Sequence, residues 1–247
     1  MDTRTTDRVA IVTGGSRGIG RATALRLAED GYAVVVGYST NETEADKVVA
    51  RIEERGGRAV TAGGDVSDEA VVRAMFDTAE REYGGVDAVV HAAGQMRLAP
   101  VAELDLDDLD RTLDVNVRGT FAVARQAVRR LREPGSLVLF STTVVPLSLP
   151  TYGAYAASKG AVEALTPILA KELRGRDVTV NTVAPGPTAT DLFLDGKSEE
   201  QVASLAKLPP LERLGTAEDI AATVAFLVGA DGHWVNGQVL RANGGII

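Results

Sequence analysis

The chain has 247 residues, 45% of them hydrophobic, and its 26 basic and 34 acidic residues give a formal net charge of -8. That length and composition suit one α/β domain with a buried core, while the acidic balance argues against a surface that follows a nucleic-acid backbone. The chain contains no cysteine and only two histidines, His91 and His233, which excludes disulfides and thiolate metal sites, and we expect no metal.

Short runs rich in β-branched residues alternate with longer helical patterns along the chain. The alternation predicts repeated βαβ units, and therefore a doubly wound α/β sheet of the Rossmann type with seven parallel strands and helices on both faces. In chain order, the predicted elements are strand 9–13, helix 18–30, strand 33–37, helix 42–55, strand 58–62, helix 68–83, strand 88–91, helix 107–131, strand 137–141, helix 155–174, strand 179–183, helix 217–228 and strand 239–241.

No linker rich in Pro or Ser divides the chain, so we place a single domain over residues 1–247. One long stretch, residues 185–210, shows no regular pattern, which is unusual for a plain connection and common for a lid over a substrate. Residues 1–7 are polar, and no run approaches the roughly 18 consecutive apolar residues of a membrane span. We therefore expect a cytoplasmic protein.

The first predicted strand passes into the first predicted helix through a glycine-rich stretch, residues 14–20, which we call the glycine turn. Gly14, Gly18 and Gly20 permit positive φ angles, close approach of a dinucleotide pyrophosphate and tight packing of the helix. The spacing is G-x3-G-x-G, and it follows a β-branched strand and opens an amphipathic helix, the context that distinguishes a cofactor site from an ordinary turn. The glycine turn therefore predicts a dinucleotide-binding site.

The end of the second predicted strand indicates which dinucleotide is bound. A site that prefers NAD usually carries an acid there for the ribose 2′-hydroxyl, whereas this chain continues into Tyr38, Ser39 and Thr40. The missing carboxylate removes a repulsion against a 2′-phosphate, and Arg17 adds a cation nearby, unless it is only a solvated loop charge. We expect NADP(H) in preference to NAD(H).

Tyr155 and Lys159 lie four residues apart at the start of a predicted helix. Residues at i and i+4 share a helix face, so we expect the Lys159 ammonium to lower the pKa of the Tyr155 phenol from about 10 toward working pH. A phenol with such a pKa both donates and accepts protons. Together with the glycine turn, the pair predicts a nicotinamide-dependent oxidoreductase.

These two motifs, in this order and at this separation, resemble those of the short-chain dehydrogenase/reductase family, and the resemblance extends over residues 7–245. Asn116 in the segment 116–119 and the pair Gly244-Gly245 also fit the family pattern. The resemblance implies a catalytic set of Asn, Ser, Tyr and Lys. Asn116, Tyr155 and Lys159 fill three of the four places.

The fourth place departs from the family pattern, because this chain has Thr142 where the family usually has Ser. Threonine offers the same donor and acceptor, and its methyl group narrows the space beside the carbonyl carbon. Ser141 is the alternative, since adjacent strand residues face opposite sides and only one of the two can point at the substrate. His91 replaces a structural Asn and is interpreted as a packed, hydrogen-bonded residue, and Asn243 replaces an Asp near the end of the chain.

The resemblance also implies roles for the site residues. Lys159 would stabilise the Tyr155 phenolate and bind the nicotinamide ribose, Asn116 would anchor a water that links Lys159 to solvent, and Thr188 and Thr190 would hold the nicotinamide carboxamide. The predicted catalytic residues are Asn116, Thr142, Tyr155 and Lys159. The predicted cofactor-binding residues are Gly14, Ser16, Arg17, Gly18, Ile19, Gly20, Tyr38, Ser39, Thr40, Asp65, Val66, Ala92, Ala93, Gly94, Tyr155, Lys159, Pro185, Gly186, Thr188 and Thr190.

The predicted activity is interconversion of a ketone and a secondary alcohol. The chain looks most like the 3-oxoacyl carrier-protein reductases, and we expect an apolar, aromatic or 3-oxoacyl substrate because the predicted pocket walls are mostly apolar. A carrier-bound substrate favours basic residues at the entrance, and the two positions that serve this in those enzymes correspond to Arg176 and Glu133, which leaves that question open. The predicted walls are Gln95, Met96, Arg97, residues 144–152, Leu192, Phe193 and Leu194.

The predicted partners are a small-molecule ketone or alcohol and further copies of the chain, with neither nucleic acid nor membrane. The helices 107–131 and 155–174 carry alanines that would permit close helix pairing, and similar proteins pair through these helices as tetramers. The same alanines would also pack well on the sheet. Two other functions stay open: a non-catalytic NADP(H)-binding sensor or scaffold, and an epimerase or dehydratase with the same Tyr and Lys.

Overall fold

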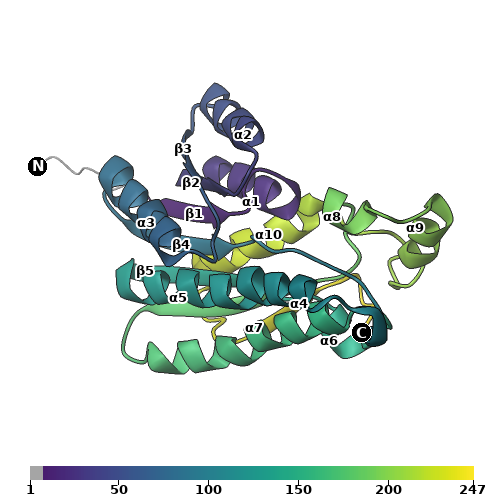
Figure 1. Cartoon of the computed structure of the whole chain (residues 1–247). Coiled ribbons are helices and arrows are strands. Elements are labelled where there is room, and N and C mark those ends of the chain that lie inside the picture. The colour runs from purple at the N-terminus through teal and green to yellow at the C-terminus, as the bar shows by residue number, and fades with distance from the viewer. Residues whose placement is uncertain (1–7) are drawn as a thin grey trace, which may run out of the picture.

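The computed structural model describes residues 8–247, so the first seven residues of the predicted domain lie outside the described part. Within it, seven strands form one sheet in the order β3-β2-β1-β4-β5-β6-β7, and all neighbouring strands are parallel (Figure 1). The predicted seven-stranded parallel sheet is confirmed. The strands are β1 Val9–Thr13, β2 Ala33–Tyr38, β3 Arg58–Gly63, β4 Val86–His91, β5 Leu131–Phe140, β6 Val178–Pro185 and β7 Val239–Ala242.

Helices cover both faces of this sheet, as predicted. The helices are α1 Gly18–Glu29, α2 Glu42–Glu54, α3 Glu69–Tyr83, α4 Leu106–Leu113, α5 Gly119–Arg130, α6 Val144–Leu147, α7 Gly153–Glu172, α8 Asp191–Leu194, α9 Glu199–Ala206 and α10 Ala217–Val228. Successive strand residues point to opposite faces, so Val9 and Ile11 of β1 pack with α3, α5 and α7, while Ala10 and Val12 pack with α1, α2 and α10.

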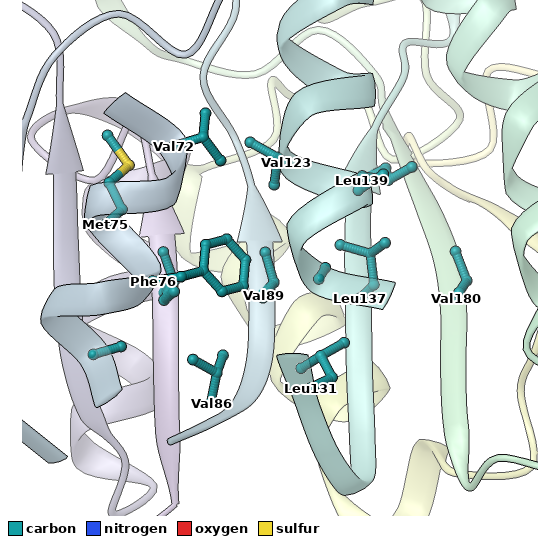
Figure 2. Close-up of a cluster of buried hydrophobic side chains, with 14 of the residues drawn as sticks. Val72, Met75, Phe76, Val86, Val89, Val123, Leu131, Leu137, Leu139 and Val180 are labelled. Carbon is teal, nitrogen blue, oxygen red and sulfur yellow. The ribbon is translucent and has the colours of Figure 1, made fainter. Parts of the chain in front are cut away.

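The cluster beneath α3 and α5 shows how this packing holds the sheet (Figure 2). Phe76 of α3, Val89 of β4 and Leu137 of β5 are fully buried in it. Burying one such side chain contributes about 1.5–3 kcal/mol, and strands covered on both faces therefore read as continuous apolar runs. The sheet is a rigid base for the loops at its carboxyl edge.

The strand order reverses between β1 and β4. The chain runs outward from β1 through β2 to β3, and outward from β4 through β5 and β6 to β7. Ligands of open α/β sheets bind in the crevice at the carboxyl ends of the strands beside such a reversal. Thr13 and His91 are paired at those ends, so the glycine turn and residues 92–94 leave the sheet side by side.

The predicted helix 107–131 is interrupted in the structure. After α4, the chain makes a π-helical turn, η2 Asp114–Arg118, before α5 continues. A π turn widens the helix locally and re-aims its side chains, and Asn116 lies in this one with no exposed surface. The strand prediction is also wrong here: β5 begins at Leu131 and not at residue 137, because Leu131 pairs with Val86.

The stretch predicted to be irregular, 185–210, contains α8 and α9. The Thr190 hydroxyl caps α8 by accepting from Phe193 N at 3.3 Å. A capping box begins α9: Ser198 Oγ accepts from Gln201 N at 3.3 Å, and Gln201 Oε1 accepts from Ser198 N at 2.9 Å. The Ser-x-x-Gln spacing was a readable helix signal that the prediction missed. Figure 1 shows α9 beyond the end of the sheet.

Candidate active site

The glycine turn is a backbone cradle that only glycine allows. Gly14 has φ 65 and Gly18 has φ 52. An added Cβ would lie 2.8 Å from Ala93 N at Gly14 and 2.1 Å from Gly14 O at Gly20. The cradle therefore stays open at the N-terminus of α1, where amide groups and the helix dipole favour a pyrophosphate. These residues fit a dinucleotide.

Two other predicted segments close around the glycine turn. Residues 92–94 leave β4 directly beneath Gly14, and a Cβ at Gly18 would lie 3.5 Å from Thr190 Cγ2. A Cβ at Gly94 would lie 3.4 Å from Lys159 Nζ. The structure thus brings the glycine turn, the end of β4, the segment before α8 and Lys159 together at one edge of the sheet.

The region predicted for the cofactor's adenosine half is more open. Arg17, Ser39 and Thr40 are exposed. Desolvation raises the pKa of Tyr38, and a hydrogen bond to the Glu42 carboxylate raises it further. Glu42 therefore brings a carboxylate to this region, although the end of the second strand itself carries none.

Asp65 and Val66, also predicted here, follow β3. One carboxylate oxygen of Asp65, Oδ1, accepts from Ser67 N and Ser67 Oγ, both at 2.9 Å. Val66 is buried, and its Cγ2 lies 2.9 Å from where a Cβ would sit on Gly119. Asp65 stays exposed at the surface, while Val66 packs against the first residue of α5.

Ser141 and Thr142 follow the last residue of β5 and make different contacts, although both line one pocket with Tyr155 and Lys159. Ser141 Oγ donates to Glu163 Oε1 at 2.7 Å, which turns the hydroxyl toward α7. The Thr142 hydroxyl accepts from Val144 N at 3.3 Å and forms a hydrogen bond with Tyr155. Of the two hydroxyls, Thr142 is the one joined to Tyr155.

Lys159 is buried beneath the same pocket. Its Nζ donates to Phe140 O at 3.0 Å and lies 6.0 Å from the centre of the Tyr155 ring. Burial lowers the pKa of Lys159 to about 8. The ammonium therefore retains its charge at neutral pH and is held by the carbonyl group at the end of β5.

The expected lowering of the Tyr155 pKa is not found. Burial raises the pKa of Tyr155 to about 12, and the hydrogen bond from Thr142 offsets this only in part. The prediction considered only the shared helix face, but the Lys159 ammonium is directed to Phe140 O and not to the phenol oxygen. In this pocket, desolvation is the larger effect, so Tyr155 holds its proton at neutral pH.

Asn116 projects from η2 into a network of three hydrogen bonds. Its Oδ1 accepts from Gln95 N at 2.9 Å, and its Nδ2 donates to Gln95 O at 2.9 Å and to Ser158 Oγ at 3.0 Å. The Ser158 hydroxyl donates to Tyr155 O at 2.8 Å. The amide of Asn116 therefore joins the backbone after β4 to the helical turn that carries Tyr155, a role that the sequence analysis did not anticipate.

His91 is a buried, neutral residue beneath this site. Its Nδ1 shares a hydrogen bond of 2.8 Å with Thr13 Oγ1, and its Nε2 has no partner among the described residues. Burial lowers the pKa of His91 to about 3, and the charge of Lys159 adds to the shift. The packed, hydrogen-bonded histidine that the sequence analysis expected agrees with this geometry.

The pocket above Tyr155 is mostly apolar. Gln95, Met96, Leu192 and Phe193 line it as predicted, whereas Arg97 and Leu194 do not: Arg97 turns outward toward Asp108, at 3.9 Å, and Leu194 lies at the surface. Leu205 and Leu208, from the stretch predicted as a lid, also line the pocket, whereas Ile246 near the chain end was not anticipated by any sequence signal. The apolar lining residues include Ile19, Met96, Val144, Leu147, Leu149, Leu192, Phe193, Leu205, Leu208 and Ile246.

Arg176, the cation considered for docking an acidic carrier, is already paired. Its Nε donates to Glu133 Oε1 at 2.7 Å, and its Nη2 donates to Leu131 O at 2.7 Å. In residues 8–247, no helix is long and apolar enough to cross a membrane. No group of three or more His, Cys, Asp or Glu side chains in that range is placed to hold a metal ion.

Comparisons with known proteins match almost the whole chain. A family model described as enoyl-(acyl carrier protein) reductase matches residues 14–247. A short-chain type dehydrogenase/reductase from Picea abies is 46% identical over 96% of this chain and 92% of its own length. An NADPH-dependent aldehyde reductase-like protein, chloroplastic, from Arabidopsis thaliana is 41% identical over 97% and 94%. A crystal structure of a short chain dehydrogenase from Burkholderia cenocepacia J2315 in complex with NADP superimposes with a TM-score of 0.91 at 39% identity, over 97% of both chains.

Proposed function

Because the chain belongs to the short-chain dehydrogenase/reductase family of NAD(P)-dependent oxidoreductases, we propose that it reduces a ketone to a secondary alcohol with NADP(H). One observation carries the proposal: Thr142, Tyr155 and Lys159 line a single apolar pocket that adjoins the glycine turn. Hydroxyl donors in one pocket suit a carbonyl oxygen, and apolar walls would keep water away from it.

The geometry of the pocket supports a role for each of these three residues in the proposed reaction. A bound nicotinamide cofactor supplies the hydride in this chemistry. Tyr155 gives its proton to the developing alkoxide, and the Thr142 hydroxyl, oriented by Val144 N, shares the oxygen with it. Lys159 holds a positive charge beneath them, with its Nζ hydrogen-bonded to Phe140 O and 6.0 Å from the centre of the Tyr155 ring.

The protonation state of Tyr155 favours reduction over the reverse reaction. With a pKa of about 12, Tyr155 is protonated at neutral pH and ready to act as an acid. Oxidation of an alcohol needs the phenolate, which is scarce until the pH rises. We expect the rate of reduction to hold through neutral pH, while the rate of oxidation rises into the alkaline range.

We assign an apolar or aromatic ketone as the substrate class, with a 3-oxoacyl chain as the carrier-linked variant. The apolar lining supports this class. The pairing of Arg176 with Glu133 favours a free small molecule, because this cation is not available to an acidic carrier. The Arabidopsis relative named as an aldehyde reductase extends the class to aldehydes.

NADP(H) is the cofactor that we favour, supported by the relatives named for NADPH or solved with NADP. Arg17 lies exposed within the glycine turn, where it can meet a 2′-phosphate, although the Glu42 carboxylate lies at the same end of the site. Dissociation constants of NADPH and NADH measured by fluorescence test this preference. We expect tighter NADPH binding, and Arg17→Ala should weaken NADPH binding more than NADH binding.

The test of the catalytic assignment compares Tyr155→Phe with Tyr152→Phe, which removes a hydroxyl from the same pocket. NADPH consumption is followed by absorbance with a panel of ketones and aldehydes. Tyr155→Phe should lose turnover and keep NADPH binding, whereas Tyr152→Phe should remain active. Full activity of Tyr155→Phe would remove our assignment, and no turnover by the unmodified protein on any carbonyl would favour a cofactor-binding sensor.

Four further assignments belong to the same proposal. Residues 1–247 act as one domain, and residues 185–210, with α8 and α9, form the lid over the substrate. The assembly that we propose is a homotetramer, to be measured by light scattering. The location that we propose is the cytoplasm, although a relative is named as chloroplastic, and fractionation tests it.

A further inference from the structure

One polar group in the substrate pocket is left without a partner: the side-chain nitrogen of Gln95. Its Nε2 is buried and makes no hydrogen bond with any described residue. Gln95 lines the same pocket as Thr142 and Tyr155. Burying an amide donor without an acceptor costs free energy, which a bound molecule with a suitably placed oxygen would recover. Rotation of this side chain toward the pocket would make the nitrogen available to a ligand.

The backbone that carries this side chain is fixed relative to Tyr155. The Asn116 amide bonds both Gln95 N and Gln95 O at 2.9 Å and reaches Ser158 Oγ at 3.0 Å. The Ser158 hydroxyl continues to Tyr155 O at 2.8 Å. This network joins the two residues through buried groups, so the backbone from which the Gln95 side chain extends is fixed relative to the helical turn that carries Tyr155.

The pocket also contains other hydroxyl groups, such as that of Tyr152, but among its lining side chains only Gln95 has a buried donor without a partner in the described residues. The walls around Gln95 are apolar side chains such as Met96, Leu147 and Phe193. Thr142 and Tyr155 are assigned to the reacting carbonyl. A ketone with a single oxygen would accept from Thr142 and Tyr155 and leave Gln95 Nε2 unpaired. A substrate with a second oxygen would also accept from Gln95 Nε2.

We propose that Gln95 determines specificity by donating a hydrogen bond from Nε2 to a second carbonyl oxygen of the substrate. This inference rests on the proposed function and narrows its substrate class to apolar or aromatic 1,2- and 1,3-dicarbonyl compounds. One carbonyl is reduced at Tyr155, and the other is held by Gln95. A site that bonds a substrate oxygen discriminates strongly against the analogue that lacks it, since the buried donor is then left unpaired.

The test compares 1-phenyl-1,2-propanedione with 1-phenyl-1-propanone, which lacks the second oxygen, as substrates with NADPH. Gln95→Met keeps the length of the side chain and removes both polar atoms, and Gln95→Glu keeps an oxygen but has no N–H donor. Both variants should lower kcat/KM for the dione at least about 10-fold more than for the monoketone. Met96→Leu, a change to the neighbouring wall residue, should alter both substrates by the same factor.

For each substrate, kcat/KM of the variant is divided by kcat/KM of the unmodified protein. This ratio is compared between substrates because a dione is intrinsically more reactive than a monoketone. Equal losses on both substrates in Gln95→Met would make Gln95 a purely structural residue and overturn the inference. Full dione activity in Gln95→Glu would overturn the donor role.

A binding measurement separates failure of this inference from failure of the proposed function. The dissociation constant of the dione is measured by calorimetry in the presence of NADP+, which has no hydride to transfer, for the unmodified protein and for Gln95→Met. If the dione and the rest of the carbonyl panel are not reduced, the proposed function fails, and this measurement still decides the role of Gln95. Binding at least about 10-fold weaker in Gln95→Met supports the inference, and equal binding overturns it.

Discussion

The buried His91 makes a quantitative prediction about stability and pH. In the folded protein burial lowers the pKa of His91 to about 3, whereas in the unfolded chain it takes its ordinary value of 6.5. The unfolded state therefore binds one more proton between these two values, so the stabilising contribution is complete above pH 6.5 and is lost as the pH falls toward 3. The neutral imidazole is held by Thr13 Oγ1 at 2.8 Å, away from water.

The folded and unfolded pKa values of His91 give the size of the change in the free energy of unfolding. At pH 7.5, the unfolded histidine is almost neutral, and the linkage contribution is close to zero. At pH 5, the unfolded histidine is protonated, while the folded one is not, and the free energy of unfolding falls by about 2 kcal/mol from this group alone. His91→Asn removes this titration and keeps a polar side chain that can bond Thr13.

The assay is urea unfolding of the unmodified protein and of His91→Asn at pH 7.5 and at pH 5, at one protein concentration. All other titrating groups are shared, so they cancel in the difference between the two proteins. The unmodified protein should lose about 2 kcal/mol more than His91→Asn between these pH values. Equal losses would show that His91 is not kept neutral by burial, and the reasoning would fail.

Substitutions at the two ends of the site give further predictions. Gly20→Ala should weaken NADPH binding at least about 10-fold in a fluorescence titration, because its Cβ would lie 2.1 Å from Gly14 O and open the cradle. Gly160→Ala is the matched control: no atom lies within 4 Å of the added Cβ, and a helix-interior alanine should raise the free energy of unfolding by about 0.5–1 kcal/mol. Thr142→Val should lower kcat about 100-fold, whereas Ser141→Ala should lower it far less; the reverse order would make Ser141 the catalytic hydroxyl.

Much of the fold could be predicted from the sequence because the residues that specify a strand or a helix lie close together in the chain. β1 spans Val9–Thr13 and α10 spans Ala217–Val228, the predicted bounds in both cases. Strand or helix periodicity and the residues that flank each run are enough to place such elements. The glycine turn was readable for the same reason, since its strand, its glycines and its helix are contiguous in the sequence.

The π turn η2 was not readable, because its cause lies elsewhere in the chain. The buried side chain of Asn116 forms hydrogen bonds with Gln95 and Ser158, which are 21 and 42 residues away in sequence. Helical propensity alone continues the α-helix through this point. The early start of β5 has a similar origin, since Leu131 becomes strand only by pairing with Val86.

The sequence by itself determined the order of strands and helices, the glycine turn, and a Tyr and a Lys on one helix face, because each depends on neighbours a few residues apart. Only the tertiary structure decided which hydroxyl meets Tyr155, where the Lys159 ammonium points, and that Gln95 Nε2 is left without a partner. It also reversed the expected pKa shift of Tyr155, because desolvation depends on everything packed around a group, which no local spacing records.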